Sequence, residues 1–192
     1  HGPLCISIHA MGWVPIGQAI TRGGAQVDDV IMVSGSLGDS AAGLQIMQQK
    51  GDVLHTLSQR FWNPTPRIGL GQWLRNKATA CLDISDGLVQ DLGHILAASG
   101  CGADIQLQDL PLSAALQAHA PQSQAWNFAL SGGEDFELCF TLPAHFVAAA
   151  QAYSLTHNLP LTVIGRTSAE LGCRIWNEAG GLVTAPQGYQ HF

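Results

Sequence analysis

Three aspartates stand close together in a chain that carries little charge. Asp83, Asp86 and Asp91 fall within residues 79–92, although only 11% of all residues are charged. The apolar run before Asp83 predicts a strand, and Ser85 is predicted to cap the helix that follows, so Asp83 and Asp86 should converge at a strand-to-helix junction. Such paired carboxylates suit Mg²⁺, which binds oxygen ligands and often completes its shell with substrate phosphate.

A purely structural explanation of the same aspartates stays open. The helix dipole favours an acid in the first helical turn by about 0.3 to 1 kcal/mol, which would explain Asp86 without a ligand. Asp91 would then be solvated surface. Asp83 is harder to explain in this way, because a carboxylate at the end of an apolar strand is costly unless something neutralises it. Chemistry alone leaves both metal or phosphate binding and helix capping as hypotheses.

Further candidate ligand groups lie in three other loops. Glu134 and Asp135 follow a Ser-Gly-Gly turn, where glycine lets backbone approach a ligand, or they belong to a polar loop before an edge strand. Residues 35–40, Gly-Ser-Leu-Gly-Asp-Ser, precede a predicted helix and form either a phosphate cradle or a tight turn with a helix cap. Arg22 precedes two glycines and is either a phosphate clamp or plain surface charge.

Other kinds of active site find no support in the sequence. The loop at 35–40 lacks the Gly-Lys-Ser/Thr ending of a P-loop and the G-x-G-x-x-G spacing of a dinucleotide site. None of the eight histidines forms an H-x-x-x-H pair, and His94 is predicted to lie on a helix surface. There is neither a G-x-S-x-G elbow nor a convincing Cys–His pairing, so covalent catalysis is not expected and no residue is assigned as a nucleophile or base.

Composition indicates a folded protein and excludes some classes of binding partner. The 192 residues are 46% hydrophobic, and 14 acidic against 8 basic residues give a net charge of −6. Because Lys and Arg do not cluster, a nucleic-acid surface is not expected. No stretch reaches the roughly 18 to 20 apolar residues of a membrane span. Five scattered cysteines without a C-x-x-C pair favour a reducing cytoplasm.

The elements that must position these groups mix strands and helices, which predicts an α/β or α+β fold. An alternating apolar run over 4–11 predicts an opening strand, and with no Met ahead of it the chain is expected to be a piece of a longer one. The spacing of apolar residues, helix-capping residues and Gly or Pro breakers predict the other strands and helices. Strands are expected at 30–33, 79–84, 103–107, 136–142 and 161–164 and in a hairpin of 174–176 with 182–183, and helices at 41–49, 53–61, 67–77, 85–100, 113–118 and 144–156.

Two motifs, in their order and separation, resemble the thiamine-monophosphate kinase family. They are Leu-Asp-Ile-Ser-Asp-Gly-Leu at 82–88 and Leu-Ser-Gly-Gly-Glu-Asp-Phe-Glu-Leu at 130–138. Phe136 stands where the family more often has Tyr, a change that removes one hydroxyl group. The resemblance extends over nearly the whole chain, through residues 35–43, 64–68, 110–112 and 188–192.

The resemblance implies an α+β domain, a mixed sheet flanked by helices, as in enzymes related to aminoimidazole ribonucleotide synthetase. That family transfers the γ-phosphoryl group of ATP to thiamine monophosphate with several Mg²⁺ ions. Carried over by position, the implied magnesium ligands are Asp83 and Asp86, the implied ATP contacts are Arg22 and Ser85, and the implied substrate contacts are Glu134 and Tyr189.

The resemblance also implies that part of the enzyme is missing here. Nothing in the chain matches the family's amino-terminal domain, which carries a Gly-Asp-Asp motif, further metal-binding aspartates, much of the ATP site and most of a homodimer interface. Residues 1–192 are therefore expected to be the carboxyl-terminal domain, with 1–20 a strand and linker from the junction, and to be inactive alone. Two other hypotheses remain, namely another ATP-using synthetase of the same superfamily and a non-catalytic module that binds a phosphorylated ligand.

Overall fold

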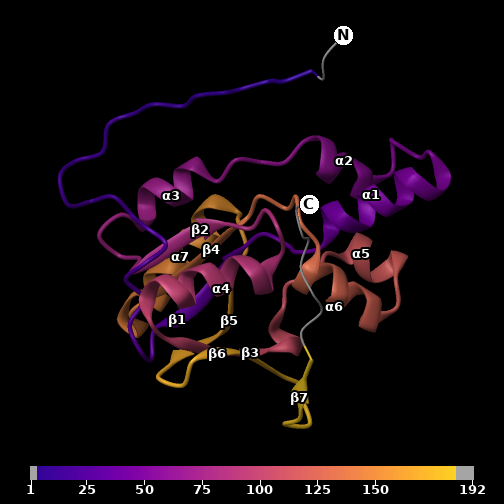
Figure 1. The fold of residues 1–192 in the computed structure, drawn as a ribbon. Helices are drawn as coiled ribbons and strands as arrows, with labels where there is room; N and C mark the ends of the chain where they lie inside the picture. The colour runs from indigo at the N-terminus through magenta and orange to yellow at the C-terminus, as the bar shows by residue number, and fades with distance from the viewer. Residues whose placement is uncertain (1–3, 185–192) are drawn as a thin grey trace.

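The computed structural model describes residues 4–184 and centres on one seven-stranded sheet (Figure 1). The strands are β1 (Val30–Ser34), β2 (Ala80–Asp83), β3 (Gly102–Gln106), β4 (Leu138–Leu142), β5 (Leu161–Ser168), β6 (Gly172–Trp176) and β7 (Leu182–Val183). Their order in the sheet is β2-β4-β1-β5-β3-β6-β7. Every neighbouring pair is antiparallel except β3 and β6, which are parallel, so the sheet is mixed, as predicted.

Helices cover both faces of this sheet. They are α1 (Asp39–Lys50), α2 (Thr56–Trp62), α3 (Ile68–Leu74), α4 (Leu88–Ser99), α5 (Ala114–His119), α6 (Gln122–Ser131) and α7 (Val147–His157), with short 3-10 turns at Leu107–Asp109 and Ala144–Phe146. Alternate strand residues point to opposite faces. In β1, Ile31 and Val33 therefore join the core under α4 and α6, whereas Val30 and Met32 join the core under α3 and α7. The predicted mixed sheet flanked by helices is confirmed.

A smaller third core lies at one end of the sheet. It is formed by α1, α2, α5 and α6, which lie together in Figure 1. Ile46 of α1, Leu57 of α2 and Leu116 of α5 are its largest buried side chains. Because two of these helices have only six or seven residues, their stability depends on this packing rather than on intrinsic helix propensity.

The helix predicted to follow the aspartate motif is present and uses the predicted face. Leu88, Leu92 and Ile95 of α4 are fully buried against the sheet. Gly100 ends the helix in the left-handed conformation, with its amide donating to the carbonyl of Leu96. A helix C-terminus of this kind favours glycine because glycine has no Cβ to clash.

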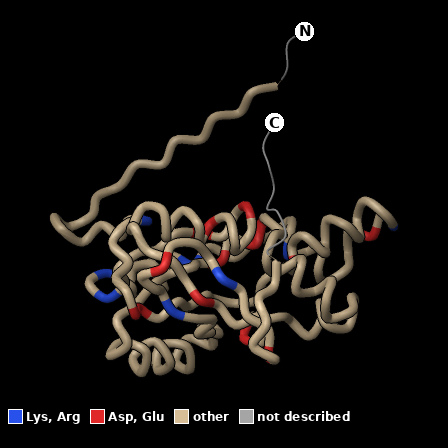
Figure 2. Tube along the Cα trace, turned by 60° about the horizontal axis from the view of Figure 1, so that its bottom comes forward, with Lys and Arg blue, Asp and Glu red and all other residues tan. Residues whose placement is uncertain are grey.

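The opening strand is the one predicted strand that the structure contradicts. Residues 4–11 form no strand, and Leu4, Ile6 and Ile8 are 75 to 90% exposed. Figures 1 and 2 show this segment leading away from the body of the fold, and Figure 2 shows no charged position on it. An alternating pattern fixes which side chains share a face, but strand backbone also needs a paired neighbour, and no described strand pairs here.

Several other elements differ from the prediction in position or existence; the helix expected at 67–77 ends at Leu74, and the strand expected at 161–164 runs to Ser168. Helix α6 was not predicted, because Ser, Asn and Gln dilute its helical pattern; Ala125 and Ala129 are nevertheless fully buried. Helix α2 begins at Thr56 rather than at residue 53, because the His55 ring caps it by accepting from the Leu57 amide. Strand β4 begins at Leu138 rather than at residue 136.

Candidate functional site

The loops that carry the candidate residues meet at one edge of the sheet. Strand β4 pairs antiparallel with both β1 and β2, so the ends of β1 and β2 lie beside the start of β4. Asp83, the last residue of β2, is paired with Leu138, the first residue of β4. The segments that follow β1 and β2 and the segment that precedes β4 therefore share this edge.

The loop after β2 is held by a carboxylate from the next helix. Asp91 Oδ2 accepts hydrogen bonds from the amides of Ser85 and Asp86, each at 2.9 Å. Asp91 is only 4% exposed, so the expectation that it is solvated surface is wrong. Burial raises its pKa, against the opposing effect of these two amides and of His94. The loop thus has a rigid support that sequence spacing did not reveal.

Ser85 and Asp86 lie before helix α4 rather than in it. The helix cap is Gly87, whose φ of 109° is in the range that favours glycine, and the predicted Ser85 cap is wrong. A Cβ on Gly87 would also lie 2.7 Å from the backbone carbonyl carbon of Ser131. This close approach brings the end of α6 against the aspartate loop.

The second motif pairs its backbone with the first. The Glu134 amide donates to the Ser85 carbonyl and the Phe136 amide donates to the Ile84 carbonyl, both at 2.9 Å, while the Ile84 amide donates to the Glu137 carbonyl at 2.7 Å. A Cβ on Gly133 would lie 2.3 Å from the Ser85 carbonyl oxygen, so this contact requires glycine. Two segments about fifty residues apart in sequence are therefore one structural unit.

The candidate residues differ in exposure. Asp83 and Glu134 are exposed, and Asp86 and Ser85 are half-buried. Arg22 is exposed in the segment beside β2, where the carbonyl of the preceding residue accepts from the Cys81 amide at 3.0 Å. The structure thus brings Asp83, Ser85, Asp86 and Glu134 to one edge and leaves Arg22 beside the same strand. Tyr189 lies outside the described residues, and His94 is exposed on α4, as expected.

The loop at 35–40 is capped by protein rather than open to a phosphate. Asp135 Oδ2 accepts from the Gly38 amide at 2.6 Å, and its Oδ1 accepts from the Ser40 amide at 3.2 Å. These are the amides that a phosphate at this helix terminus would use. The tight turn is present, but the helix is capped by Asp135 rather than by a side chain of the N-cap residue Gly38, and the phosphate cradle is not supported. Burial raises the pKa of Asp135 to about 7, since it is only 1% exposed.

A buried ion-pair cluster beside this turn was not predicted. Glu137 is 1% exposed and accepts from Ser34 Oγ at 2.6 Å, from Arg67 Nε at 2.7 Å and from Arg60 Nη2 at 3.0 Å. Arg67 contributes a second hydrogen bond through Nη2, so its guanidinium is bidentate. The cluster opens on a cavity of about 450 Å³ that Gly35, Ser36 and both arginines line in part. A charged residue in an otherwise apolar strand pattern was the available sequence signal.

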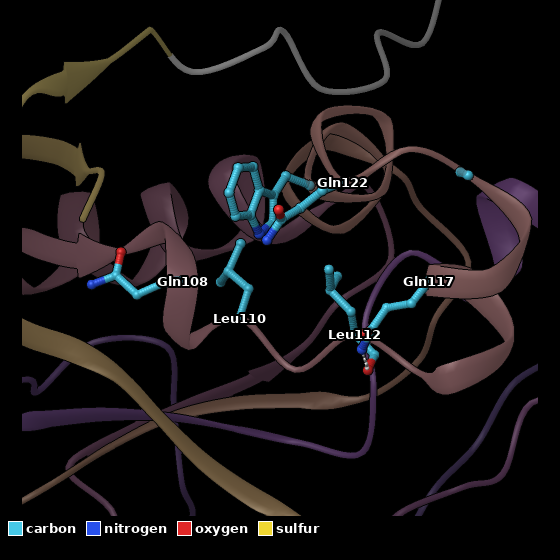
Figure 3. A pocket seen from close by; sticks show the side chains of 7 residues that line it. Gln108, Leu110, Leu112, Gln117 and Gln122 are labelled. Atoms are coloured by element: carbon cyan, nitrogen blue, oxygen red, sulfur yellow. Dashed lines mark hydrogen bonds between the residues drawn. The ribbon is translucent and has the colours of Figure 1, made fainter. Parts of the chain in front are cut away.

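A second cavity lies between the 108–112 segment, α5 and α6, and shares Leu112 with the first. It encloses about 390 Å³ and is lined by Gln108, Leu110, Leu112, Gln117, Ala120, Gln122 and Trp126 (Figure 3). Figure 3 shows Gln117 beside Leu112 and Leu110 between Gln108 and Gln122. No lining residue is charged, so this cavity offers no counter-charge to a phosphate.

The aspartate pair fits part of a magnesium shell. Exposed Asp83 and half-buried Asp86 flank the short turn after β2, and Mg²⁺ is usually held by one or two carboxylates together with water and substrate phosphates. Within residues 4–184, no group of three or more His, Cys, Asp or Glu side chains is arranged to hold a metal ion. A complete shell would therefore need ligands beyond those described. The described helices also include none long and apolar enough to cross a membrane.

Comparison with known proteins gives consistent matches. Residues 26–176 match the family described as AIR synthase related protein, C-terminal domain. The thiamine-monophosphate kinase of Salmonella typhimurium is 45% identical over 197 residues, covering 100% of this chain and 61% of that protein. The chain therefore spans 61% of the length of this curated relative.

Solved structures give the same picture. The crystal structure of thiamine-monophosphate kinase from Stenotrophomonas maltophilia superposes with a TM-score of 0.81 at 42% identity, over 84% of this chain and 54% of that one. A structure described as AaThiL complexed with AMPPCP and TMP has a TM-score of 0.76 at 35% identity, over 90% of this chain and 54% of that one.

Proposed function

The chain belongs to the AIR synthase related protein family, C-terminal domain, and on that premise we propose that it forms the carboxyl-terminal part of an ATP-dependent thiamine-monophosphate kinase. The reaction would transfer the γ-phosphoryl group of ATP to thiamine monophosphate and release thiamine diphosphate and ADP. The proposal concerns a longer protein, since this chain spans 61% of its Salmonella typhimurium relative.

The observation that carries the proposal is the backbone pairing of the two motif loops. The Glu134 amide bonds the Ser85 carbonyl, so a group proposed to contact the substrate and a group proposed to contact ATP lie in one unit. The related AaThiL structure was obtained with AMPPCP and TMP together, which supports a shared site for a nucleotide and a second phosphorylated ligand.

Asp83 and Asp86 are the residues that would hold Mg²⁺. Bound there, the ion would supply positive charge against the phosphate oxygens of the two substrates. The described part of the chain contributes a fixed backbone for the turn that carries these carboxylates, because Asp91 accepts hydrogen bonds from the amides of Ser85 and Asp86. Placement of this kind is what phosphoryl transfer requires, since the reaction depends on positioning and charge stabilisation more than on covalent participation of the protein.

The remaining roles are those that the family resemblance implies by position, and exposure and chemistry are compatible with them. Ser85 and Arg22 are assigned to the phosphates of ATP, as a hydroxyl donor and as a guanidinium in an exposed loop. Glu134 is assigned to thiamine monophosphate, whose thiazolium carries a positive charge that an exposed carboxylate suits. Tyr189 is assigned to the same substrate by sequence position alone. No side chain is assigned as a nucleophile or general base.

The proposal extends to partners and location. We assign the full-length enzyme to the cytoplasm as a homodimer; the free state of all five cysteines is compatible with a reducing compartment. We expect residues 1–192 alone to bind Mg-ATP weakly and to be inactive, because the described residues supply an incomplete metal shell. Micromolar binding of Mg-ATP by the isolated chain in calorimetry would contradict this expectation.

The direct test is substrate choice by the full-length protein. Purified enzyme with ATP and Mg²⁺ should convert thiamine monophosphate to thiamine diphosphate, detected by chromatography after oxidation to thiochromes. Formylglycinamidine ribonucleotide should give no product. Turnover of the ribonucleotide alone would favour the synthetase hypothesis, and binding of both thiamine monophosphate and ATP without thiamine diphosphate would favour a non-catalytic module.

A further inference from the structure

Two left-handed residues alternate with two buried carboxyl groups in segment 134–137. Glu134 has φ 69° and Phe136 has φ 50°, and neither is glycine. Asp135 and Glu137 are each only 1% exposed. Non-glycine residues rarely adopt positive φ, and they keep it only where the surrounding structure enforces it. The question is therefore what holds this segment in such a conformation.

The backbone and the side chains of the segment are fixed by different partners. The amides of Glu134 and Phe136 donate to the carbonyls of Ser85 and Ile84, which join the segment to the aspartate loop. The buried side chains of Asp135 and Glu137 instead bind the rest of the domain. Asp135 accepts from the first turn of α1, at Gly38 and Ser40.

Glu137 anchors the other end of the segment. It accepts from Ser34 at the end of β1, from Arg60 on α2 and twice from Arg67 at the start of α3. A Cβ on Gly35 would lie 2.2 Å from Glu137 Oε1, so the carboxylate packs against this glycine in the space that any other side chain would need. Phe136 thus lies between two residues, Asp135 and Glu137, whose side chains both form hydrogen bonds to other parts of the domain.

We propose that Asp135 and Glu137 are positioning residues, which, through α1, Arg60 and Arg67, hold Glu134 and Phe136 in their left-handed conformations against the Ser85 loop. Neither side chain touches the substrates in this assignment. Their effect reaches the reaction through Glu134, so the inference rests on the proposed function for its kinetic consequence. Its structural consequence, the pairing of segment 134–137 with Ile84 and Ser85, does not depend on that function.

The test variant is Arg67→Lys in the full-length enzyme. Lysine keeps the positive charge but cannot reproduce the bidentate geometry of the guanidinium, and Arg60 still pairs with Glu137. The matched control is Arg174→Lys, because Arg174 also makes a bidentate pair, with Asp104, and its side chain is 17% exposed against 16% for Arg67. Arg174 lies on β6, away from the site.

Two readouts separate positioning from a general loss of folded enzyme. Arg67→Lys should raise the KM for thiamine monophosphate roughly tenfold, as expected for loss of one charge-assisted hydrogen bond, with a smaller change in kcat. It should also speed hydrogen exchange of the Glu134 and Phe136 amides, and Arg174→Lys should change neither. Simple destabilisation would instead lower the amount of active enzyme and leave the KM unchanged.

A second variant, Asp135→Asn, tests the Asp135 side chain. It keeps the inference testable if Arg67→Lys does not fold. It removes one acceptor for the α1 amides and should change the same KM and the same two amides in the same direction. Unchanged KM and unchanged exchange in both variants would overturn the inference, as would equal effects in Arg174→Lys. If the wild-type enzyme makes no thiamine diphosphate, the proposed function fails, and the exchange measurement alone decides the inference.

Discussion

The buried Asp135 predicts that the stability of the domain falls as pH rises toward neutrality. Burial raises the pKa of this carboxyl from 3.8 to about 7, against the amides of Gly38 and Ser40 and the charge of Arg60, which lower it; the nearby Asp39 raises it further. In the unfolded chain the group ionises near its ordinary pKa. Between these two pKa values the unfolded state loses its proton and the folded state retains it, so rising pH favours unfolding.

The size of the effect follows from the displacement of the pKa. Roughly three pH units correspond to about 4 kcal/mol in total, at 1.36 kcal/mol per unit. Between pH 5 and pH 8 the contribution is about 2 to 3 kcal/mol, because part of the change lies below pH 5 and the curve levels above pH 7. This is a large share of the about 5 to 15 kcal/mol by which domains are stable.

Urea unfolding of wild type and Asp135→Asn at pH 5, 6, 7 and 8 would measure this contribution. Asparagine has nearly the same shape and does not ionise, so the difference between the two proteins isolates residue 135. Relative to Asp135→Asn, the wild type should lose about 2 to 3 kcal/mol from pH 5 to pH 8. A difference that stays constant over this range, or that grows in favour of the wild type, would refute a raised pKa at this carboxyl.

Three further predictions concern the site and its support. Gly133→Ala should lower the free energy of unfolding by about 1 to 3 kcal/mol, measured by urea denaturation, because the new Cβ meets the Ser85 carbonyl oxygen; an unchanged value would mean that the loops can separate freely. Leu92→Ala should cost about 2 to 5 kcal/mol in the same assay through a cavity under α4, while the KM values of the full-length enzyme stay unchanged. Chelation of Mg²⁺ with EDTA should abolish thiamine diphosphate formation by the full-length enzyme, and added Mg²⁺ should restore it; full activity in EDTA would remove the proposed role of Asp83 and Asp86.

Local sequence signals predicted most of the fold because each depends on near neighbours. The alternating and continuous apolar runs predicted five strands of the sheet and its closing hairpin, and Gly100 predicted the end of α4. The apolar run at 4–11 shows why a local pattern is not sufficient for a strand. Its pattern is that of a strand, but a strand also needs a neighbouring strand with free backbone groups to pair with. No local pattern contains that information.

The sequence named candidate residues, whose roles stay proposals, but not the groups that hold their loops in place. The two motifs identified Ser85 and Glu134, and the structure places their backbones in contact. The carboxylates that hold them could not be assigned, because Glu137 pairs with arginines 70 and 77 residues away in the sequence. Asp91 was misassigned for a related reason, since its burial depends on the path of the loop rather than on the helical period.

The central claim is that the loop after β2 holds the metal and phosphates of a kinase. Turnover of Asp86→Asn in the full-length enzyme tests it most directly, beside Asp109→Asn as a control on an exposed 3-10 turn. The substitution is nearly isosteric, so Asp86→Asn should remain folded and lose turnover by orders of magnitude, about 100-fold or more, while Asp109→Asn keeps wild-type activity. Wild-type turnover by Asp86→Asn would contradict the claim and leave this residue with only a structural role.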